Sequence, residues 1–364
     1  MATEKLNGIQ ALRFVAASMV VVLHSTYFVH ERGNPQFGLW KPGYYGVHIF
    51  FVISGLVMVL GAERLRNSSS GAAEFFRRRL VRIVPLYWIV NSVKLAIVFL
   101  IPSVAVSSID ASNVVASFLF VPALASNGKI EPFYGVGWTL NFEVAFYAAF
   151  ALALWSRKSP TIWLSPLLIG LATLSLVKSP AWGAIAFYCD PIVLNFMWGM
   201  MIGASLRQGH RLSAPLATAL AAIGFAIILL APDTRMLGLQ FAAVVLGVAH
   251  LEFYIADRIP KLLLRGGAAS YALYLSHPIV GPAIALVGAR LEIAPAVIVP
   301  AIWAVSTAAG LLVFARVEAP TARLINRLWT PPYSGRNLRP DDSAVGVAGG
   351  RAVLHSQGTR RIHP

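Results

Sequence analysis

The chain has few charged residues and a single cysteine. Charged side chains make up 12% of its 364 residues, about half of the roughly 25% found in soluble domains. Hydrophobic residues account for 57%, and the mean hydropathy is +0.68. This composition excludes a disordered protein or a nucleic-acid module and predicts a protein embedded in a membrane. Cys189 has no second cysteine to pair with, which excludes an intrachain disulfide and a metal site built on cysteines.

Ten apolar segments of roughly spanning length predict an all-α polytopic membrane protein with about ten transmembrane helices. The first contains Arg13 and His24 and lacks a small-residue cleavage site, so we expect it to remain as helix one. Residues 114–125 are too few to cross, and we expect an interfacial or re-entrant piece there. The ten segments are residues 11–29, 43–61, 83–101, 138–155, 162–177, 184–206, 215–231, 237–255, 268–287 and 295–315.

The net charge of +15 indicates an orientation rather than a nucleic-acid partner, because Lys and Arg of membrane proteins gather in cytoplasmic loops. A cytoplasmic N-terminus places most of the 30 Lys and Arg residues inside, provided that the number of crossings is even. We therefore expect both termini in the cytoplasm. Residues 1–328 are expected to form the transmembrane domain, and residues 329–364, rich in Pro, Gly, Ser and Arg, a disordered basic cytoplasmic tail.

Helix one carries two ionisable residues at membrane depth, where each costs about 2.5 to 3.5 kcal/mol on insertion scales. Arg13 and His24 are eleven positions apart, almost three helical turns, so both side chains should project from one face about 16 Å apart. Arg13 has a structural alternative as a snorkelling anchor, and His24 has one as a buried, hydrogen-bonded histidine. The functional alternative is that His24 takes a proton from an attacking hydroxyl while a partner fixes its tautomer.

Candidate partners of His24 follow from counting residues inward from the helix ends. Glu143, five residues into its segment, and His48 are expected near the level of His24, and His277 nearer mid-membrane. Glu143 could instead serve only to pin helix packing, but carboxylates are so poorly tolerated in membranes that function is favoured. For His48 and His277 the structural and functional alternatives both stay open.

Four arginines lie within six positions where the second loop enters helix three: Arg77, Arg78, Arg79 and Arg82. Such a cluster ordinarily sets topology and contacts anionic lipid. The alternative is a grip on a phosphate-rich cytosolic ligand, for which the forked donors of arginine are suited. Arg79 and Arg82, at i and i+3, should share one helical face.

Taken in order, these motifs resemble the membrane acyltransferase type 3 family, and most closely its exopolysaccharide O-acetyltransferases. The resemblance covers roughly residues 6–320. Its pieces are residues 9–13 (IQALR) leading to His24, 46–55 (GVHIFFVISG), Arg79-x-x-Arg82, 138–147 (WTLNFEVAFY), 271–277 (YALYLSH) and 318–320 (EAP).

The resemblance implies transfer of an acyl group, usually acetyl from acetyl-CoA, to a sugar hydroxyl of an exported or lipid-linked glycan at a bacterial inner membrane. His24 would be catalytic, with Glu143 or a neighbouring histidine orienting it, and Arg13, Arg79 and Arg82 would bind the acyl donor. His48, Trp138, Tyr147 and His277 would contact substrate or support the site. Acyl-CoA would be a co-substrate, and neither a permanently bound cofactor nor a metal is expected.

Two positions depart from the family pattern. The family commonly has Asp where this chain has His48, and often Glu where it has Asn195; whether the nearby Asp190 substitutes for that Glu stays open. The alternative function is a transporter or flippase of lipid-linked sugars, since intramembrane His, Glu and Arg also line translocation paths. The sequence shows no repeated halves, which disfavours that alternative.

Overall fold

The computed structural model describes residues 6–66, 68–101, 110–231 and 237–329, and these residues form helices with no β-strand. The predicted basic tail, residues 329–364, lies outside the described residues except for Trp329. The helices are α1 (Asn7–Arg32), α2 (Tyr45–Ala62), α3 (Gly71–Leu100), α4 (Ala111–Phe118), α5 (Trp138–Trp155), α6 (Pro160–Leu174), α7 (Ala184–Tyr188), α8 (Leu194–Arg207), α9 (Ala214–Leu230), α10 (Leu239–Ile255), α11 (Lys261–Ala268), α12 (Ser270–Arg290), α13 (Pro295–Val313) and α14 (Ala319–Leu328).

Seven helical stretches in the described part of the chain are long and apolar enough to cross a membrane. They comprise α1, α2, α3, α5, α10, α12 and the continuous run from α13 to α14. The all-α, membrane-spanning class predicted from composition is thus confirmed. Helices α6, α8 and α9 have only 15, 14 and 17 residues, so the total of ten crossings stays a prediction.

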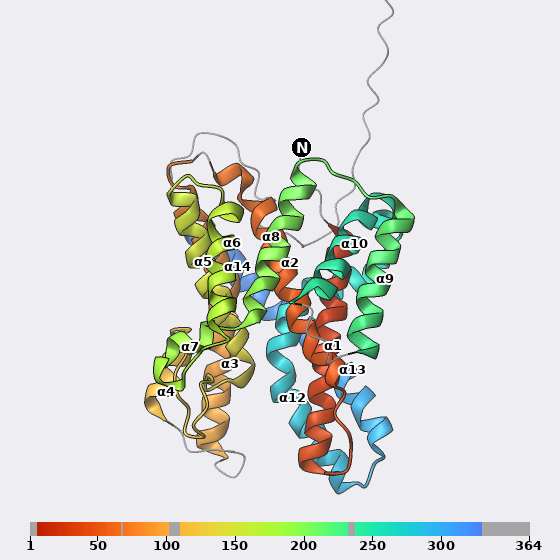
Figure 1. Ribbon diagram of the computed structural model, residues 1–364. Coiled ribbons are helices and arrows are strands. Elements are labelled where there is room, and N and C mark those ends of the chain that lie inside the picture. Colours follow the sequence, from red (N-terminus) through yellow and green to blue (C-terminus); the bar gives the residue numbers. More distant parts are fainter. Residues whose placement is uncertain (1–5, 67, 102–109, 232–236, 330–364) are drawn as a thin grey trace, which may run out of the picture.

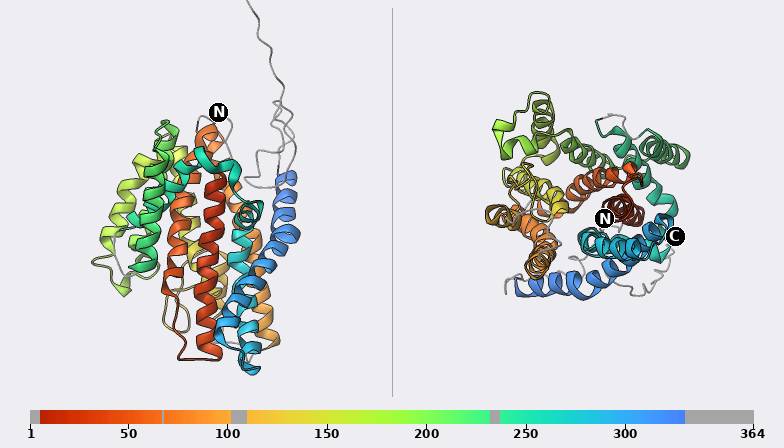
Figure 2. Two further views of the ribbon diagram at one scale, coloured as in Figure 1. Left: turned by 90° about the vertical axis from the view of Figure 1, so that its right-hand side faces the viewer. Right: turned by 90° about the horizontal axis from the view of Figure 1, so that it is seen from below.

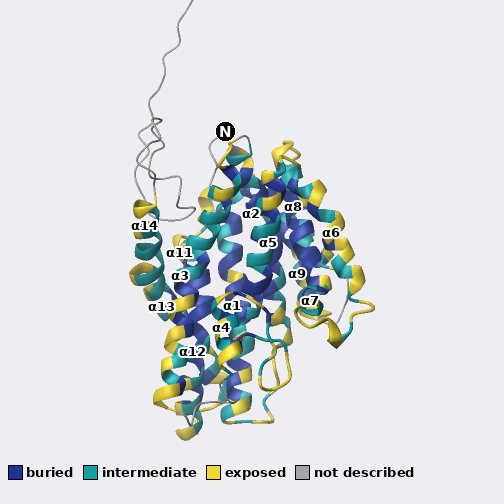
Figure 3. Cartoon of the chain, turned by 90° about the vertical axis from the view of Figure 1, so that its left-hand side faces the viewer, coloured by how far each residue is buried: buried dark blue, intermediate teal, exposed yellow. Residues whose placement is uncertain are grey.

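Helix α1 runs through the middle of the bundle and packs against α2, α10, α12 and α13 (Figures 1 and 2). The end at which α1 begins, here called the N-terminal face, is also the end toward which α14 runs (Figure 2). Burial concentrates in α1, α2 and α8, whereas peripheral helices such as α6 expose much of their surface (Figure 3). Many exposed residues are large and apolar, including Leu100, Ile162 and Leu230, as expected of a surface that faces lipid.

The central pair α2 and α8 cross at very close range because glycines meet at the crossing. A Cβ atom on Gly55 would lie 2.9 Å from the backbone nitrogen of Met200, and one on Gly199 would lie 2.9 Å from that of Leu56. Small residues let helices approach in lipid, where packing replaces the hydrophobic driving force between them. This crossing holds α2, which lines the site described below, firmly against α8.

Two predicted segments differ from the structure, and a third agrees with it. The segment 184–206 is not one helix, because Pro191 cannot continue a hydrogen-bonded helix and Asp190 instead accepts from the backbone N–H of Ile192 at 2.9 Å, which starts a new turn before α8. The third helix starts at Gly71 rather than near residue 83, so the arginine cluster is helical. The short piece predicted at 114–125 overlaps α4, whose eight residues are too few to cross, as expected.

The start of α1 is fixed by a carboxylate from a distant helix. Glu252 of α10, which is buried, accepts hydrogen bonds from the backbone N–H groups of Asn7 and Gly8, both at 2.6 Å. The first N–H groups of a helix have no intrahelical acceptor, and a negative charge there also favours the helix dipole. Glu252 therefore sets the position at which α1, and with it Arg13, enters the bundle.

Candidate active site

Arg13 and His24 both face α12. The Nη2 group of Arg13 donates to Ser270 Oγ at 2.9 Å, and Nδ1 of His24 lies 2.7 Å from Nε2 of His277, with the two rings within 13° of parallel. The common face predicted from the eleven-residue spacing is confirmed. Of the two kinds of partner expected for His24, the structure selects a histidine.

The hydrogen bonds around His277 determine the tautomers of both rings. Its Nδ1 lies 3.2 Å from the carbonyl of Leu273 and also interacts with that of Tyr274, which lacks its usual helical donor because Pro278 has no N–H. Carbonyls only accept, so Nδ1 of His277 carries the proton and its Nε2 accepts from Nδ1–H of His24. The lone pair of His24 is thereby placed on Nε2, where it can act as a base.

A pocket opens between α1, α2, α3, α5 and α12, and its lining combines mostly apolar side chains with a few charged and hydroxyl groups, as is common in small-molecule sites. Arg13, Arg79 and Arg82 all line it. Along α2 the lining extends from Val57 to Val47, ten residues or about 15 Å at the helical rise. The three arginines belong to the half nearer the N-terminal face, so the pocket combines a cationic entrance half with a deeper apolar half.

The deep end of the pocket is formed by Tyr274 and Thr139. Their hydroxyls lie 3.1 Å apart, and that of Tyr274 donates to the carbonyl of Val136 at 2.9 Å. The ring of Tyr274 is 6.0 Å from that of His277. Among the described residues the two histidines are not part of the pocket lining, so Tyr274 separates the pocket from the His24–His277 pair.

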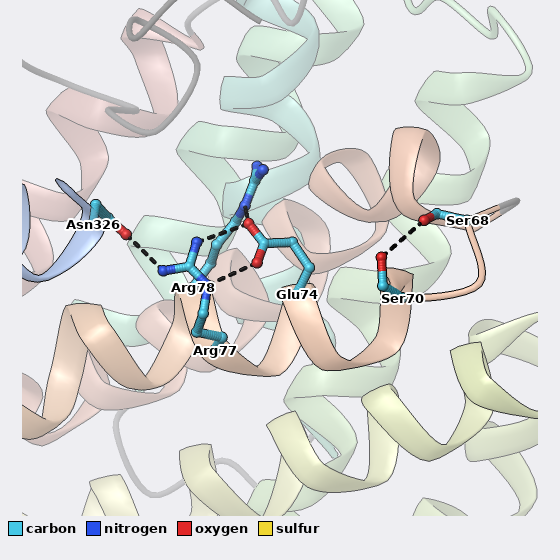
Figure 4. Close-up of polar contacts among 6 residues, drawn as sticks. All are labelled: Ser68, Ser70, Glu74, Arg77, Arg78 and Asn326. Atoms are coloured by element: carbon cyan, nitrogen blue, oxygen red, sulfur yellow. Dashed lines mark hydrogen bonds and ion pairs between the residues drawn. The ribbon is translucent and has the colours of Figure 1, made fainter. Parts of the chain in front are cut away.

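The four clustered arginines divide into two pairs with different surroundings, and Figure 4 shows the first pair, Arg77 and Arg78. Glu74, one turn earlier on α3, accepts from Arg77 at 2.7 and 2.8 Å and from Arg78 at 2.6 Å, and Arg77 also donates to Asn326 of α14 at 3.0 Å. Arg77 and Arg78 are therefore both held at the helix surface by Glu74, which offsets one of their two positive charges. Arg79 and Arg82 face the pocket instead, which confirms the shared face predicted from their spacing.

Arg79 is held mainly by aromatic rings and a carbonyl. Its guanidinium lies 5.4 Å from the ring of Phe75 and 5.8 Å from that of Tyr147, and Nη2 donates to the carbonyl of Val57 at 3.3 Å. The described residues give Arg82 no hydrogen-bond partner. Glu318, which ends a π-helical turn (Phe314–Glu318), is within electrostatic range of Arg13 and Arg82. Glu143 is likewise within electrostatic range of Arg13 and Arg79. Three guanidinium groups and two carboxylates thus surround the hollow, and the excess positive charge suits an anionic ligand.

Glu143 lies in the pocket and not beside His24, which corrects the level expected from the sequence. Its Oε1 accepts from the hydroxyls of Ser54 and Tyr147, both at 3.0 Å. Ser54 is nine residues into α2, about 13 Å from the start of that helix. The count was misleading because α2 and α5 begin inside the bundle and not at its outer end, so five residues into α5 is already deep.

A comparison with protein families gives a match to an acyltransferase domain over residues 6–315. The chain belongs to this acyltransferase family. A similar curated protein is the exopolysaccharide production protein ExoZ of Rhizobium meliloti (strain 1021), which is 34% identical over 304 residues, covering 76% of this chain and 89% of the relative. No solved structure matches. With seven apolar helical stretches among its described residues, the protein is a multi-pass membrane acyltransferase.

In this acyltransferase, the two residues that depart from the family pattern, His48 and Asn195, are in contact. Nδ2 of Asn195 lies 3.0 Å from Nδ1 of His48 and also donates to the carbonyl of Ile192 at 2.9 Å. Two positions that commonly carry carboxylates in the family thus form one neutral pair here. Asp190 does not take the place of Asn195 in this contact, since it caps the turn that begins at Pro191.

The remaining predicted residues occupy two different places in the acyltransferase. Tyr147 lines the pocket next to Glu143, whereas Trp138 lies at the first position of α5 and its ring stacks on that of Tyr44. Sequence reasoning missed Ser270 and Tyr274 as site residues. Tyr274 lies within the recognised run 271–277, but only the contact with Thr139 from another helix shows that it closes the pocket.

Proposed function

We propose that this acyltransferase transfers an acetyl or similar acyl group from acyl-CoA to a sugar hydroxyl of an exopolysaccharide or another lipid-linked surface glycan, at a bacterial inner membrane. The observation that carries the proposal is the pocket that contains three guanidinium groups and ends at Tyr274, next to the His24–His277 pair. The production of exopolysaccharide named for the relative supports a glycan acceptor.

The acyl donor is proposed to enter from the N-terminal face, which would be cytoplasmic. Phosphates of the coenzyme would bind Arg13, Arg79 and Arg82, since guanidinium forks bind phosphate oxygens in pairs. The extended arm of the coenzyme would follow the apolar half of the pocket toward Tyr274. The thioester would then reach the two histidines from the side of the N-terminal face. Movement of the Tyr274 ring is required for this approach, because that ring closes the deep end.

At the reaction centre, Nε2 of His24 is proposed to take the proton of the sugar hydroxyl while the oxygen attacks the thioester carbonyl. The carbon–sulfur bond then breaks, the new ester bond remains on the sugar, and the departing sulfur takes up the proton from His24. His277 orients His24 throughout by accepting from its Nδ1–H, which makes it a positioning residue.

The proposal is tested by replacing His24 with Ala in cells that produce the glycan and measuring its acyl content. Acylation should be lost while the protein accumulates in the membrane at the parental level; Phe253→Ala, at an exposed position of α10, is the control. Purified parent protein should also release CoA from labelled acetyl-CoA when glycan is supplied. Glycan translocation without acyl turnover would instead show that the protein moves sugars, and normal acylation by His24→Ala would reject the role of His24.

A further inference from the structure

Two aromatic rings outside the pocket form a partly exposed surface, here called the aromatic platform and consisting of Tyr44 and Trp138. Their rings are within 11° of parallel with centroids 6.4 Å apart, and Tyr44 is 47% exposed. Each ring is supported from behind: His48 meets Tyr44 edge-on at 5.5 Å, and Phe142 meets Trp138 edge-on at 6.0 Å. The platform is therefore packed against other aromatic rings and partly exposed.

The platform does not lie where aromatic residues ordinarily anchor a membrane protein, which is at the ends of its helices. Gly43, just before the platform, packs against Leu23 of α1, and α1 continues nine residues further, about 13 Å. Gly137 packs against the ring of Tyr87, and α3 continues thirteen residues beyond it, about 20 Å. The exposed ring of Tyr44 and the partly buried ring of Trp138 are thus recessed from the outer ends of the surrounding helices.

A carboxylate stands next to these rings. Asp190, at the break between α7 and α8, is within electrostatic range of the Tyr44 hydroxyl. Its Oδ1 accepts from the N–H of Ile192 at 2.9 Å, and Oδ2 has no hydrogen-bond partner among the described residues. Aromatic faces bind the apolar C–H faces of sugar rings, and a carboxylate accepts hydrogen bonds from sugar hydroxyls. Lipid chains would use the rings but gain nothing from Asp190, so this combination favours a carbohydrate.

The platform and the pocket lie on opposite sides of Tyr274. Tyr44 is within electrostatic range of Tyr274, and Trp138 directly precedes Thr139, whose hydroxyl meets that of Tyr274. The arginines lie on the other side of this contact, toward the N-terminal face. Donor and acceptor would therefore reach the histidines from opposite directions.

We propose that Tyr44, Trp138 and Asp190 form the subsite for the acceptor, binding one pyranose ring so that a neighbouring hydroxyl reaches His24. This rests on the proposed transfer to a glycan. The acceptor would thus be recognised by residues at the starts of α2 and α5 and at the break between α7 and α8. None of these residues lines the pocket that contains the arginines.

The test uses the full chain in nanodiscs, [14C]acetyl-CoA, and oligosaccharides cut from the polysaccharide of a strain that lacks this protein. Tyr44→Ala and Trp138→Ala should raise the KM for the oligosaccharide on the order of tenfold, with the KM for acetyl-CoA unchanged. Tyr44→Phe, which keeps the ring, should retain the parental KM. Asp190→Asn, which keeps an oxygen for the turn at Ile192, should raise the oligosaccharide KM.

Two exposed aromatic residues serve as controls. Tyr254 is 46% exposed on α10, and Trp155 is 75% exposed at the other end of the same helix as Trp138; Tyr254→Ala and Trp155→Ala should leave both KM values at the parental level. The proposal is overturned if Tyr44→Ala and Trp138→Ala leave the oligosaccharide KM unchanged, or if both KM values and the unfolding temperature change together. If the parent itself fails to acylate any oligosaccharide, the proposed function fails instead.

Discussion

Replacing His277 by Leu tests whether this histidine sets the tautomer of His24. His277 is completely buried, and Leu is of similar size, so the packing of α12 should be kept while the acceptor of the His24 Nδ1–H is removed. His277→Gln is the conservative variant, because its amide oxygen can still accept that hydrogen bond.

The expected loss follows from the 2.7 Å contact between the two rings. Leaving a buried N–H without an acceptor costs about 1 to 3 kcal/mol, and the tautomer with the proton on Nδ1 is disfavoured by the same amount. At about 1.4 kcal/mol for each factor of ten, kcat should fall about 5- to 150-fold in His277→Leu. Removing the base itself in His24→Ala should cost more, about 10² to 10⁴. His277→Gln should lie between the parent and His277→Leu.

The assay is the transfer of labelled acetyl to the glycan under single-turnover conditions, with the KM for acetyl-CoA measured alongside. That KM should not change, because His277 is not part of the pocket lining. In a His24→Ala background, His277→Leu should cause no further loss, since its effect acts through His24. Full activity of His277→Leu, or an undiminished additional loss in the His24→Ala background, would refute the tautomer reasoning.

Two further predictions concern the arginines and the start of α1. Arg79→Ala should raise the KM for acetyl-CoA about tenfold or more, since a charge-assisted hydrogen bond contributes about 1.5 to 3 kcal/mol; steady-state kinetics at varied acetyl-CoA check this. Arg78→Ala, on the same helix but paired with Glu74, should leave that KM unchanged, and an equal effect of both variants would contradict the division of the cluster. Glu252→Ala should destabilise the protein by about 1 to 2 kcal/mol, because two N–H groups of α1 lose their acceptor. Thermal unfolding in detergent measures this, with exposed Asp257→Ala as control, and equal midpoints for the two variants would argue against the cap.

The parts of the site that could be predicted from sequence are those set within one helix. The shared face of Arg13 and His24, and that of Arg79 and Arg82, follow from the helical repeat alone and are confirmed. Glu74 pairs with the arginines that follow it at i+3 and i+4, and the other two arginines of the cluster remain available. The spacing alone would have been enough to recognise this local pairing.

The parts that could not be predicted depend on how far each helix extends along the membrane normal. Counting residues from a helix end assumes that all helices end at one level, and α2 and α5 do not. Glu143 was consequently placed too near His24. The contact between His24 and His277 depends in addition on the rotation of α12 about its axis, which its nearly continuous apolar sequence leaves open. The pair Asp190-Pro191, at which the helix breaks, can be read in the sequence. The length of the apolar segment around it nevertheless favours a single helix.

The hydrogen-bond chain that starts at His24 stops at the backbone of α12. A carbonyl holds no proton to exchange, so charge gained by His24 has no route onward through His277 to either surface of the membrane. In the proposed mechanism, each catalytic cycle would then begin and end with the same protonation at this centre. Acyl transfer by such a protein would neither draw on nor dissipate a proton gradient, even though its base is buried within the insulating layer that maintains one.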